Sequence, residues 1–318
     1  MPGKLALIKV TLSVNGFYGY LYTSRLVKTI LIRAYSNLED HFKPTKGPIP
    51  KLLHITPLYR SVDGGVECIY SYAECKSRRG LVKCSGPPVT VELSGDYYFY
   101  IGLHESVVRS VDVISALLNY AECFEFIKQK VCVEVRGLDL TNPEITSREV
   151  AGRVLGARGV KVVFSSPVML RDPLKTTRRQ KTLLPTPIAV FATPLYAKLY
   201  ATGGYRRGVF RRELLRIHRL LNETYSVLRS VRVKWIYYSD KPIPALTGYV
   251  NYRLDENYLN HLESHGVNVT EWLSEIFAFT LTLGVGAGRA AGFGHVELKP
   301  LGVASTTSST GFTSASQK

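Results

Sequence analysis

The sequence lacks several features that would assign it to common classes of protein. It contains no run of about 20 apolar residues, so no membrane-spanning helix is expected. The segment from Met1 to Lys4 leads directly into an alternating pattern and shows neither the apolar core nor the cleavage site of a signal peptide. We therefore expect a cytoplasmic protein that has no membrane partner.

Cysteine is scarce and irregularly spaced. The chain contains five cysteines, which is an odd number, and no two of them form a C-x-x-C pair. This arrangement predicts neither a disulfide framework nor a zinc site, and we expect most of these residues to pack as small apolar side chains. No motif in the sequence calls for a metal or another cofactor.

Positive charge is present in excess. Lysine and arginine number 41 against 25 acidic residues, which gives a formal net charge of +16. A charge of this size favours association with polyanions, although it does not determine a fold. Nucleic acid is the first candidate partner. An anionic membrane surface is the second, and the lack of a spanning helix and of a signal peptide argues against it. With 318 residues, the chain is long enough for two globular domains.

The spacing of apolar residues predicts the order β-α-β-β-α-β twice. The expected helices are Ser24–Phe42, with Ser24 as the N-cap, Glu105–Tyr120, Val209–Leu228 and Asn268–Leu283. Strands over Cys123–Val135 and Phe293–Leu298 are expected to close the two halves. This order is that of the ferredoxin-like fold.

The domain organisation follows from this repeat. A less regular stretch over Arg136–Gly159 predicts a boundary between the halves. We expect an α+β protein of two tandem ferredoxin-like domains, residues 1–140 and 141–302. Residues 303–318 are mainly Ser, Thr, Gly and Ala, which bury too little surface to offset ordering entropy, so this tail is expected to be disordered.

The most informative motif is the glycine-rich segment from Gly284 to Gly294. Glycine tolerates positive φ and lets another backbone approach, so that successive N–H groups can bind phosphate oxygens. The segment follows a predicted helix, precedes a predicted strand and lacks the P-loop lysine, which excludes a nucleotide-binding loop. We expect a phosphate cradle, with a simple turn as the alternative, and its contacts would be Gly284, Gly286, Gly288, Arg289, Gly292 and Gly294.

Two clusters of basic residues offer further contacts to a polyanion. The run from Arg171 to Lys181 contains a turn at Asp172-Pro173 and suits phosphate contacts across an RNA stem. Its expected contacts are Arg171, Lys175, Arg178, Arg179 and Lys181. The second cluster is helical, with Arg212, Arg216 and Arg219 on one side, and ion pairing or solubility is its alternative explanation.

These motifs resemble the CRISPR-associated repeat-processing endoribonucleases, a branch of the RAMP superfamily of RNA-binding proteins. The C-terminal motif, from Arg289 to Val296, is typical of the superfamily. Three further segments agree in order and spacing with this branch, namely Leu246–Tyr252, Ser165–Val168 and Leu53–Leu58. The resemblance extends to about residue 300 and implies tandem ferredoxin-like folds.

The resemblance also implies an activity and its residues. Members bind CRISPR repeat RNA and cut precursor CRISPR RNA within the repeat without a metal, through attack by the ribose 2′-OH that leaves a 2′,3′-cyclic phosphate. The family's histidine and lysine after the first helix correspond to His41 and Lys51. Its tyrosine within that helix has no match here, so Tyr22 or Arg33 is expected to assist. The expected partners are repeat RNA and subunits of a CRISPR effector complex, and the protein is expected to be a monomer or a homodimer.

Three alternatives remain open. His54, on a predicted strand, is a rival to His41 as the base. A protein of the same fold that binds repeat RNA without cutting it, including an effector-complex subunit, would share every motif except the catalytic set. An RRM-type module would carry a Lys/Arg-Gly-Phe/Tyr motif on its sheet, and the sequence does not contain that motif.

Overall fold

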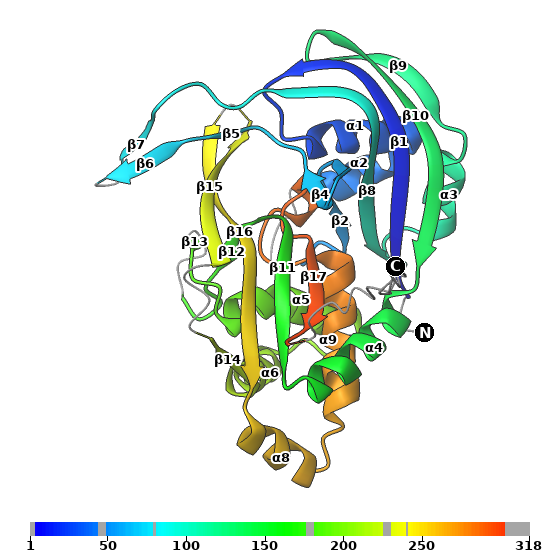
Figure 1. Cartoon of the computed structure of the whole chain (residues 1–318). Coiled ribbons are helices and arrows are strands. Elements are labelled where there is room, and N and C mark those ends of the chain that lie inside the picture. The colour runs from blue at the N-terminus through cyan, green and yellow to red at the C-terminus, as the bar shows by residue number, and fades with distance from the viewer. Residues whose placement is uncertain are drawn as a thin grey trace, which may run out of the picture.

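The computed structural model describes residues 4–43, 49–78, 81–175, 181–224, 230–239 and 241–302. These residues form an α+β protein with two large antiparallel sheets and two two-stranded ones (Figure 1). The tail expected to be disordered, residues 303–318, lies outside the described residues. Among the described residues, no helix combines the length and the apolar character needed to cross a membrane.

The first sheet has the strand order β4-β3-β8-β1-β10-β9, with β2 also paired to β8. Its central strand β1 is hydrogen-bonded to β8 and β10 in antiparallel register, with Val10 opposite both Phe99 and Leu138. The alternation seen in the sequence places Ile8, Val10 and their neighbours in the core. Its strands are β1 (Leu5–Gly19), β2 (Leu53–Ile55), β3 (Tyr59–Val62), β4 (Gly65–Cys68), β8 (Val91–His104), β9 (Ala121–Phe126) and β10 (Gln129–Thr141).

The helices that accompany this sheet are shorter than the sequence predicted. The expected helix Ser24–Phe42 is divided into α1 (Ser24–Ala34), a 3₁₀ turn (Ser36–Leu38) and α2 (Glu39–Phe42), because the chain is extended at Tyr35. Thr23 rather than Ser24 precedes the first turn, so the N-cap prediction for Ser24 was wrong. The second helix is α3 (Ser110–Leu117).

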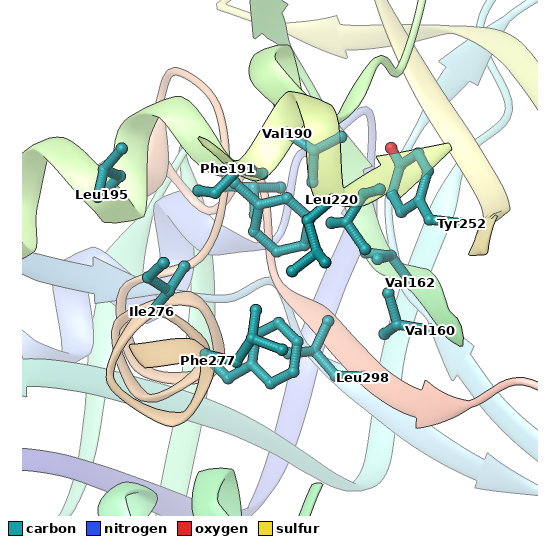
Figure 2. Packing of buried hydrophobic residues seen from close by; sticks show 14 of the residues in the cluster. Val160, Val162, Val190, Phe191, Leu195, Leu220, Tyr252, Ile276, Phe277 and Leu298 are labelled. Carbon is teal, nitrogen blue, oxygen red and sulfur yellow. The ribbon is translucent and has the colours of Figure 1, made fainter. Parts of the chain in front are cut away.

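The second sheet has the order β17-β11-β16-β15-β5, with β14 paired to β16. Helices α5 and α9 pack side chains against β11, β16 and β17 in a core that contains Val162, Phe191, Tyr252 and Phe277 (Figure 2). The elements are β11 (Gly159–Val168), β14 (Leu221–Glu223), β15 (Val231–Tyr238), β16 (Lys241–Leu254), β17 (Val296–Pro300), α5 (Pro187–Ala201), α6 (Arg207–Leu220), α8 (Glu256–Ser264) and α9 (Val269–Leu283).

Three helices of the second half were not expected, namely α4, α5 and α8. The stretch 136–159 holds the end of β10 and then α4 (Pro143–Gly156), whose N-cap Asn142 accepts a hydrogen bond from the Glu144 amide. Helix α5, with Pro187 in its first turn and Pro194 inside, was missed because its apolar residues surround the helix instead of forming a stripe. By contrast, the capping pair Asn268 and Glu271 opens α9 as expected.

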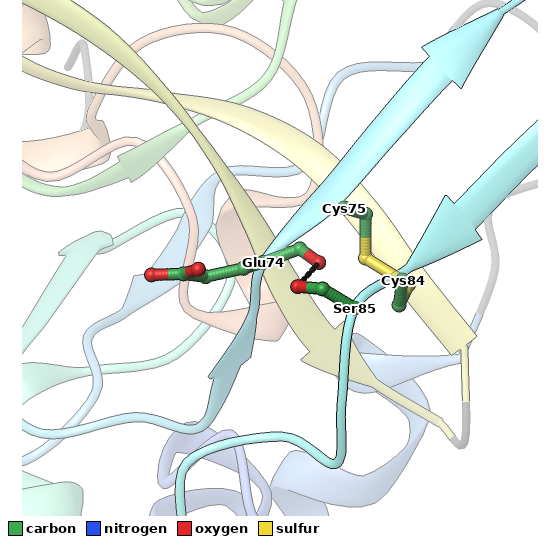
Figure 3. The surroundings of a disulfide bond; sticks show 4 residues. All are labelled: Glu74, Cys75, Cys84 and Ser85. Atoms are coloured by element: carbon green, nitrogen blue, oxygen red, sulfur yellow. Dashed lines mark hydrogen bonds between the residues drawn. A yellow bond between two sulfur atoms is a disulfide. The ribbon is translucent and has the colours of Figure 1, made fainter.

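The expectation of reduced cysteines was wrong. Disulfides join Cys75 to Cys84 (Figure 3) and Cys123 to Cys132. Each pair lies directly opposite on the strands of a hairpin, in β6 (Cys75–Arg78) with β7 (Leu81–Cys84) and in β9 with β10. The expected single strand over Cys123–Val135 is therefore a hairpin, and this turn brings the cysteines together. Cys68 remains a free thiol.

The two halves are joined by more than the covalent chain. Strand β5 (Tyr72–Ala73) comes from the first half but pairs with β15 of the second sheet. Helix α9 carries Ala278 and Phe279 in a small cluster with Leu5 from β1, while Ile276 and Phe277 face the second core. The glycine-rich segment directly follows α9, so this helix sets the position of that segment between the halves (Figure 1).

A basic cleft between the two halves

The glycine-rich segment connects α9 to β17 and is docked against the first half. The Tyr22 hydroxyl donates to the Gly292 carbonyl at 2.8 Å, and the Ser24 hydroxyl donates to the Ala291 carbonyl at 2.6 Å. His54 Nδ1 lies 3.0 Å from the carbonyl oxygen of Arg289. The segment is therefore fixed by contacts with the first helix and the second strand.

Most glycines of this segment are required by protein packing. At Gly292, φ is +93°, and a Cβ atom would lie 2.3 Å from the Cβ of Ser24. The expectation of an open cradle formed by all five glycines was wrong, because four of them are buried against the protein itself, namely Gly284, Gly286, Gly292 and Gly294. Gly288 alone among the five is exposed.

A shorter part of the segment has free backbone donors. The N–H groups of Gly288, Arg289 and Ala290 make no hydrogen bond to another residue in the described part of the chain. Gly288 has left-handed φ of +79° and precedes the 3₁₀ turn Arg289–Ala291, a conformation that points successive N–H groups to one side. The phosphate-binding expectation is thereby narrowed to these three amides.

These amides border a cleft of about 560 Å³ between the halves. Arg25 and Lys28 of α1 line it from one side, and Arg171 of β12 (Leu170–Arg171) lines it from the other. Its described lining contains no acidic side chain, and its cationic members are Arg25, Lys28, Lys51, Arg171 and Arg289. A larger cleft of about 980 Å³ between the sheets has mixed charge, so the smaller one suits a polyanion better.

Arg289 does not present its side chain to solvent as expected. Its guanidinium is buried and donates to the carbonyl oxygens of Leu283 at 3.2 Å and Lys51 at 2.7 Å. Burial lowers the pKa of Arg289 to about 10, which leaves it charged at neutral pH. We conclude that the Arg289 side chain positions Lys51 relative to the glycine-rich segment, and the prediction that this side chain binds RNA was wrong.

Lys51 lines the cleft, and His41 lies next to it, just outside the residues that form the lining. The Lys51 ammonium donates to the carbonyl oxygens of His41 and Lys43, which closes the chain after α2 onto the segment that precedes β2. Phe42, next to His41, lines the cleft with Lys51. Partial burial, together with the charge of Lys51, lowers the pKa of His41, so its imidazole is neutral at pH 7.

The structure does not support the other two expected catalytic residues. Tyr22 is 1% exposed, its ring stacks on Phe293 at 4.5 Å, and its hydroxyl is bonded to the segment. Burial raises the pKa of Tyr22 well above its ordinary value. Arg33 forms a two-bond ion pair with Glu122 on β9 and lies over the Phe124 ring. Each group therefore has a structural partner, and neither lines the cleft.

The rival base His54 is also excluded by its surroundings. It is fully buried, and burial lowers its pKa well below the ordinary value. Its ring stacks on the buried His295 at 5.6 Å. His54 therefore belongs to the interface between the halves, where its Nδ1 holds the glycine-rich segment.

The basic run from Arg171 to Lys181 is only partly described. Arg171 pairs with Lys181 across a short ladder of β12 and β13 (Lys181–Thr182), and Lys175 lies 3.9 Å from Asp172. Arg178 and Arg179 lie outside the described residues. Of this run, Arg171 is the residue that the structure places at the cleft.

Arg25 and Lys28 were not singled out from the sequence. They lie three residues apart on α1, on the side opposite the buried Leu26 and Ile30. A helical wheel would have placed them together on the polar face. It would not have shown that this face points to the glycine-rich segment.

The fold and the cleft define an α+β protein with a cationic groove of the kind that holds a nucleic-acid backbone. No family model matches the sequence, and no curated protein matches it either. A product complex of a Cas6 protein superposes with a TM-score of 0.57 at 13% identity, over 92% of this chain and 99% of that one. A partial Cas6-RT-Cas1–Cas2 complex superposes with a TM-score of 0.53 at 12% identity, over 93% of this chain and 46% of that one. The chain therefore has the fold of Cas6 proteins, which confirms the structural side of the resemblance.

Proposed function

We propose that this protein is a metal-independent endoribonuclease that binds CRISPR repeat RNA and cleaves precursor CRISPR RNA within the repeat. The observation that carries the proposal is the contact of His41 with Lys51, a residue that lines a cationic cleft bordered by three amides that have no hydrogen-bond partner among the described residues. The likeness in fold to Cas6 proteins supports the choice of substrate.

The proposed reaction is attack by a ribose 2′-oxygen on the adjacent phosphorus. Neutral His41 removes the 2′-OH proton as the new P–O bond forms, and its lowered pKa favours this neutral form. Lys51 stabilises the charge on the phosphorane and protonates the departing 5′-oxygen. The amides of Gly288 to Ala290 hold a phosphate, together with Arg25 and Lys28. The products are a 2′,3′-cyclic phosphate and a 5′-hydroxyl.

We also propose that each half, residues 1–140 and 141–302, is a ferredoxin-like domain. The strand orders β10-β1-β8-β2 and β17-β11-β16-β15 support this division, since both place the first strand of the unit between its last and its third. The proposed partners are repeat RNA and subunits of a CRISPR effector complex, and the proposed site of action is the cytoplasm. Disulfide bonds are compatible with a cytoplasmic location in hyperthermophiles, whose intracellular proteins often contain them.

The experiment that tests the activity is cleavage of a labelled repeat RNA in the presence of EDTA. We expect wild type to cut and to leave a cyclic phosphate, and His41→Ala to cut roughly 10²–10⁴-fold more slowly with similar binding. His218→Ala, which removes an exposed histidine of α6, is the matched control and should retain full activity.

A protein that binds repeat RNA without cutting it is the second candidate. The observation that favours it is the commitment of Tyr22 and Arg33 to structural contacts, which leaves His41 and Lys51 as the candidate reactive groups. Tight binding without any product, in wild type as in His41→Ala, would replace the first proposal with this one.

A further inference from the structure

The β6–β7 hairpin projects from the body of the protein (Figure 1). Another groove lies at the base of this hairpin. Its volume is about 560 Å³, and it is bounded by the base of that hairpin and by β15. We refer to it as the hairpin groove. The basic cleft shares no lining residue with it.

The hairpin groove carries an uncompensated positive charge. Lys76 and Lys83 project from the two hairpin strands, and Arg232 and Lys234 come from β15. Within the described part of the chain, none of these four side chains has a carboxylate within 4.0 Å. Glu74 is the one acidic residue of the described lining, so the groove has an excess of cations.

Aromatic rings accompany these charges. Trp235 and Tyr72 are half-buried and border the groove from opposite faces of the β5–β15 ladder, and the Lys234 ammonium, on the Tyr72 side, lies 4.5 Å from the centre of that ring. On the same face of β15 as Trp235, Tyr237 packs edge-on against Tyr20, which is 42% exposed. Flat rings beside mobile cations form the surface that single-stranded nucleic acids use, because every base can stack.

The hairpin is held in a fixed place relative to β15. The disulfide between Cys75 and Cys84 joins its two strands, and Ser85 donates two hydrogen bonds of 2.9 Å to the Glu74 carbonyl (Figure 3). Just before the hairpin, β5 pairs with β15 at Ala73 opposite Trp235. The groove is therefore built before any ligand binds, which reduces the entropy cost of binding.

We propose that the hairpin groove binds single-stranded RNA that continues from the cleavage site, and this inference rests on the proposed function. Strand β15 connects the two places, because Tyr238 at its end lines the basic cleft and Arg232 lines the groove. Six residues of strand separate them by about 20 Å. Phosphates contact the four cations, and Trp235 stacks on a base.

Fluorescence tests the stacking directly, because the chain has two tryptophans and the other one, Trp272, is buried. Titration with an unstructured oligoribonucleotide should quench wild type but not Trp235→Phe, which retains the Trp272 signal. Trp235→Ala should weaken binding about 5- to 100-fold, the loss expected for one base stack. Unquenched fluorescence on saturation with RNA would overturn the proposal.

Charge removal tests the phosphate contacts. In Lys76→Gln/Lys83→Gln, the slope of log affinity against log salt should fall by about 1.4, because two single-strand phosphate contacts are lost. The control Lys128→Gln/Lys130→Gln removes the same charge from exposed positions of the other disulfide hairpin, and it should not change the slope. The proposal would be overturned if both double variants lowered the slope equally. It would also be overturned if poly-glutamate competed for the groove as well as unlabelled RNA does.

The two proposals fail separately. Variants of the hairpin groove should raise KM for a long repeat RNA and leave kcat unchanged, while His41→Ala should lower kcat. If wild type cuts RNA and the groove variants bind it as well as wild type does, only the groove proposal fails. If wild type binds RNA with Trp235 quenching and never cuts it, only the proposed reaction fails.

Discussion

The docking of the glycine-rich segment on the first helix makes Gly292→Ala a sensitive perturbation. The added Cβ would lie 2.3 Å from the Cβ of Ser24, 2.5 Å from its Oγ and 3.1 Å from a ring carbon of Tyr22. Those neighbours belong to a buried interface and cannot move without cost. The substitution would also force alanine to adopt a φ of +93°.

The expected loss of stability has three contributions. A left-handed backbone costs a non-glycine residue about 1–2 kcal/mol. Relief of the steric overlap costs a further ~1–3 kcal/mol. The hydrogen bonds from Tyr22 and Ser24 to the segment, each worth about 1 kcal/mol, are weakened when the surfaces separate. We expect Gly292→Ala to lower the free energy of unfolding by about 3–6 kcal/mol, a large share of a typical total.

Gly266→Ala is the matched control for this experiment. Gly266 has a φ of +74° with open space around it, so its substitution costs backbone strain alone. Urea unfolding followed by circular dichroism gives both values. Adding Ser24→Gly to Gly292→Ala should recover part of the loss, because it removes the overlapping atoms. The docking argument is refuted if Gly292→Ala is no more destabilising than Gly266→Ala, or if Ser24→Gly gives no recovery.

Three further predictions concern the same interface and the hairpins. Burial lowers the pKa of His295 to about 4 from an ordinary value of 6.5, so the unfolded chain binds more protons than the folded one between these pH values. The free energy of unfolding should therefore fall by about 3 kcal/mol as the pH drops from about 6.5 towards 4. Urea unfolding at several pH values measures this fall, and His295→Gln should reduce it. Arg289→Met removes the hydrogen bond that positions Lys51 and should lower cleavage more than RNA affinity, whereas equal losses would mean a general binding role. Replacing Cys123 and Cys132 by serine should cost about 2–3 kcal/mol in urea unfolding, and dithiothreitol should then have a smaller effect on the variant than on wild type.

Local sequence patterns predicted much of the fold. The alternation of Ile8, Val10 and Val14 predicted β1, and the Asn268 capping pair predicted α9, because both signals act over a few residues. Elements without such a signal were missed, as with α5, which is apolar on all sides. The hairpin of Cys123 and Cys132 was read as one strand, so the disulfide could not be foreseen.

The candidate site was predictable in its components but not in its assembly. Composition determined that the protein is a polycation, and the motif from Gly284 to Gly294 determined where close backbone approach occurs. The tertiary structure decided which residues pack against these glycines. A contact between residues 270 positions apart, such as that of Tyr22 with Gly292, does not affect the local spacing of residue types and could not be predicted from it.

Local sequence and tertiary packing also differ in what they determine about His41 and Lys51 on the one hand and Tyr22 on the other. The family resemblance indicated His41 and Lys51 as a pair after the first helix, and the Lys51 ammonium contacts the His41 carbonyl, ten residues away in the chain. Whether Tyr22 faces RNA or the core depends on packing between the halves, which buries it. A side chain's chemical type is fixed by the sequence, but its exposure, its partners and its pKa depend on tertiary contacts. These contacts decided which basic and aromatic residues remain accessible to a ligand.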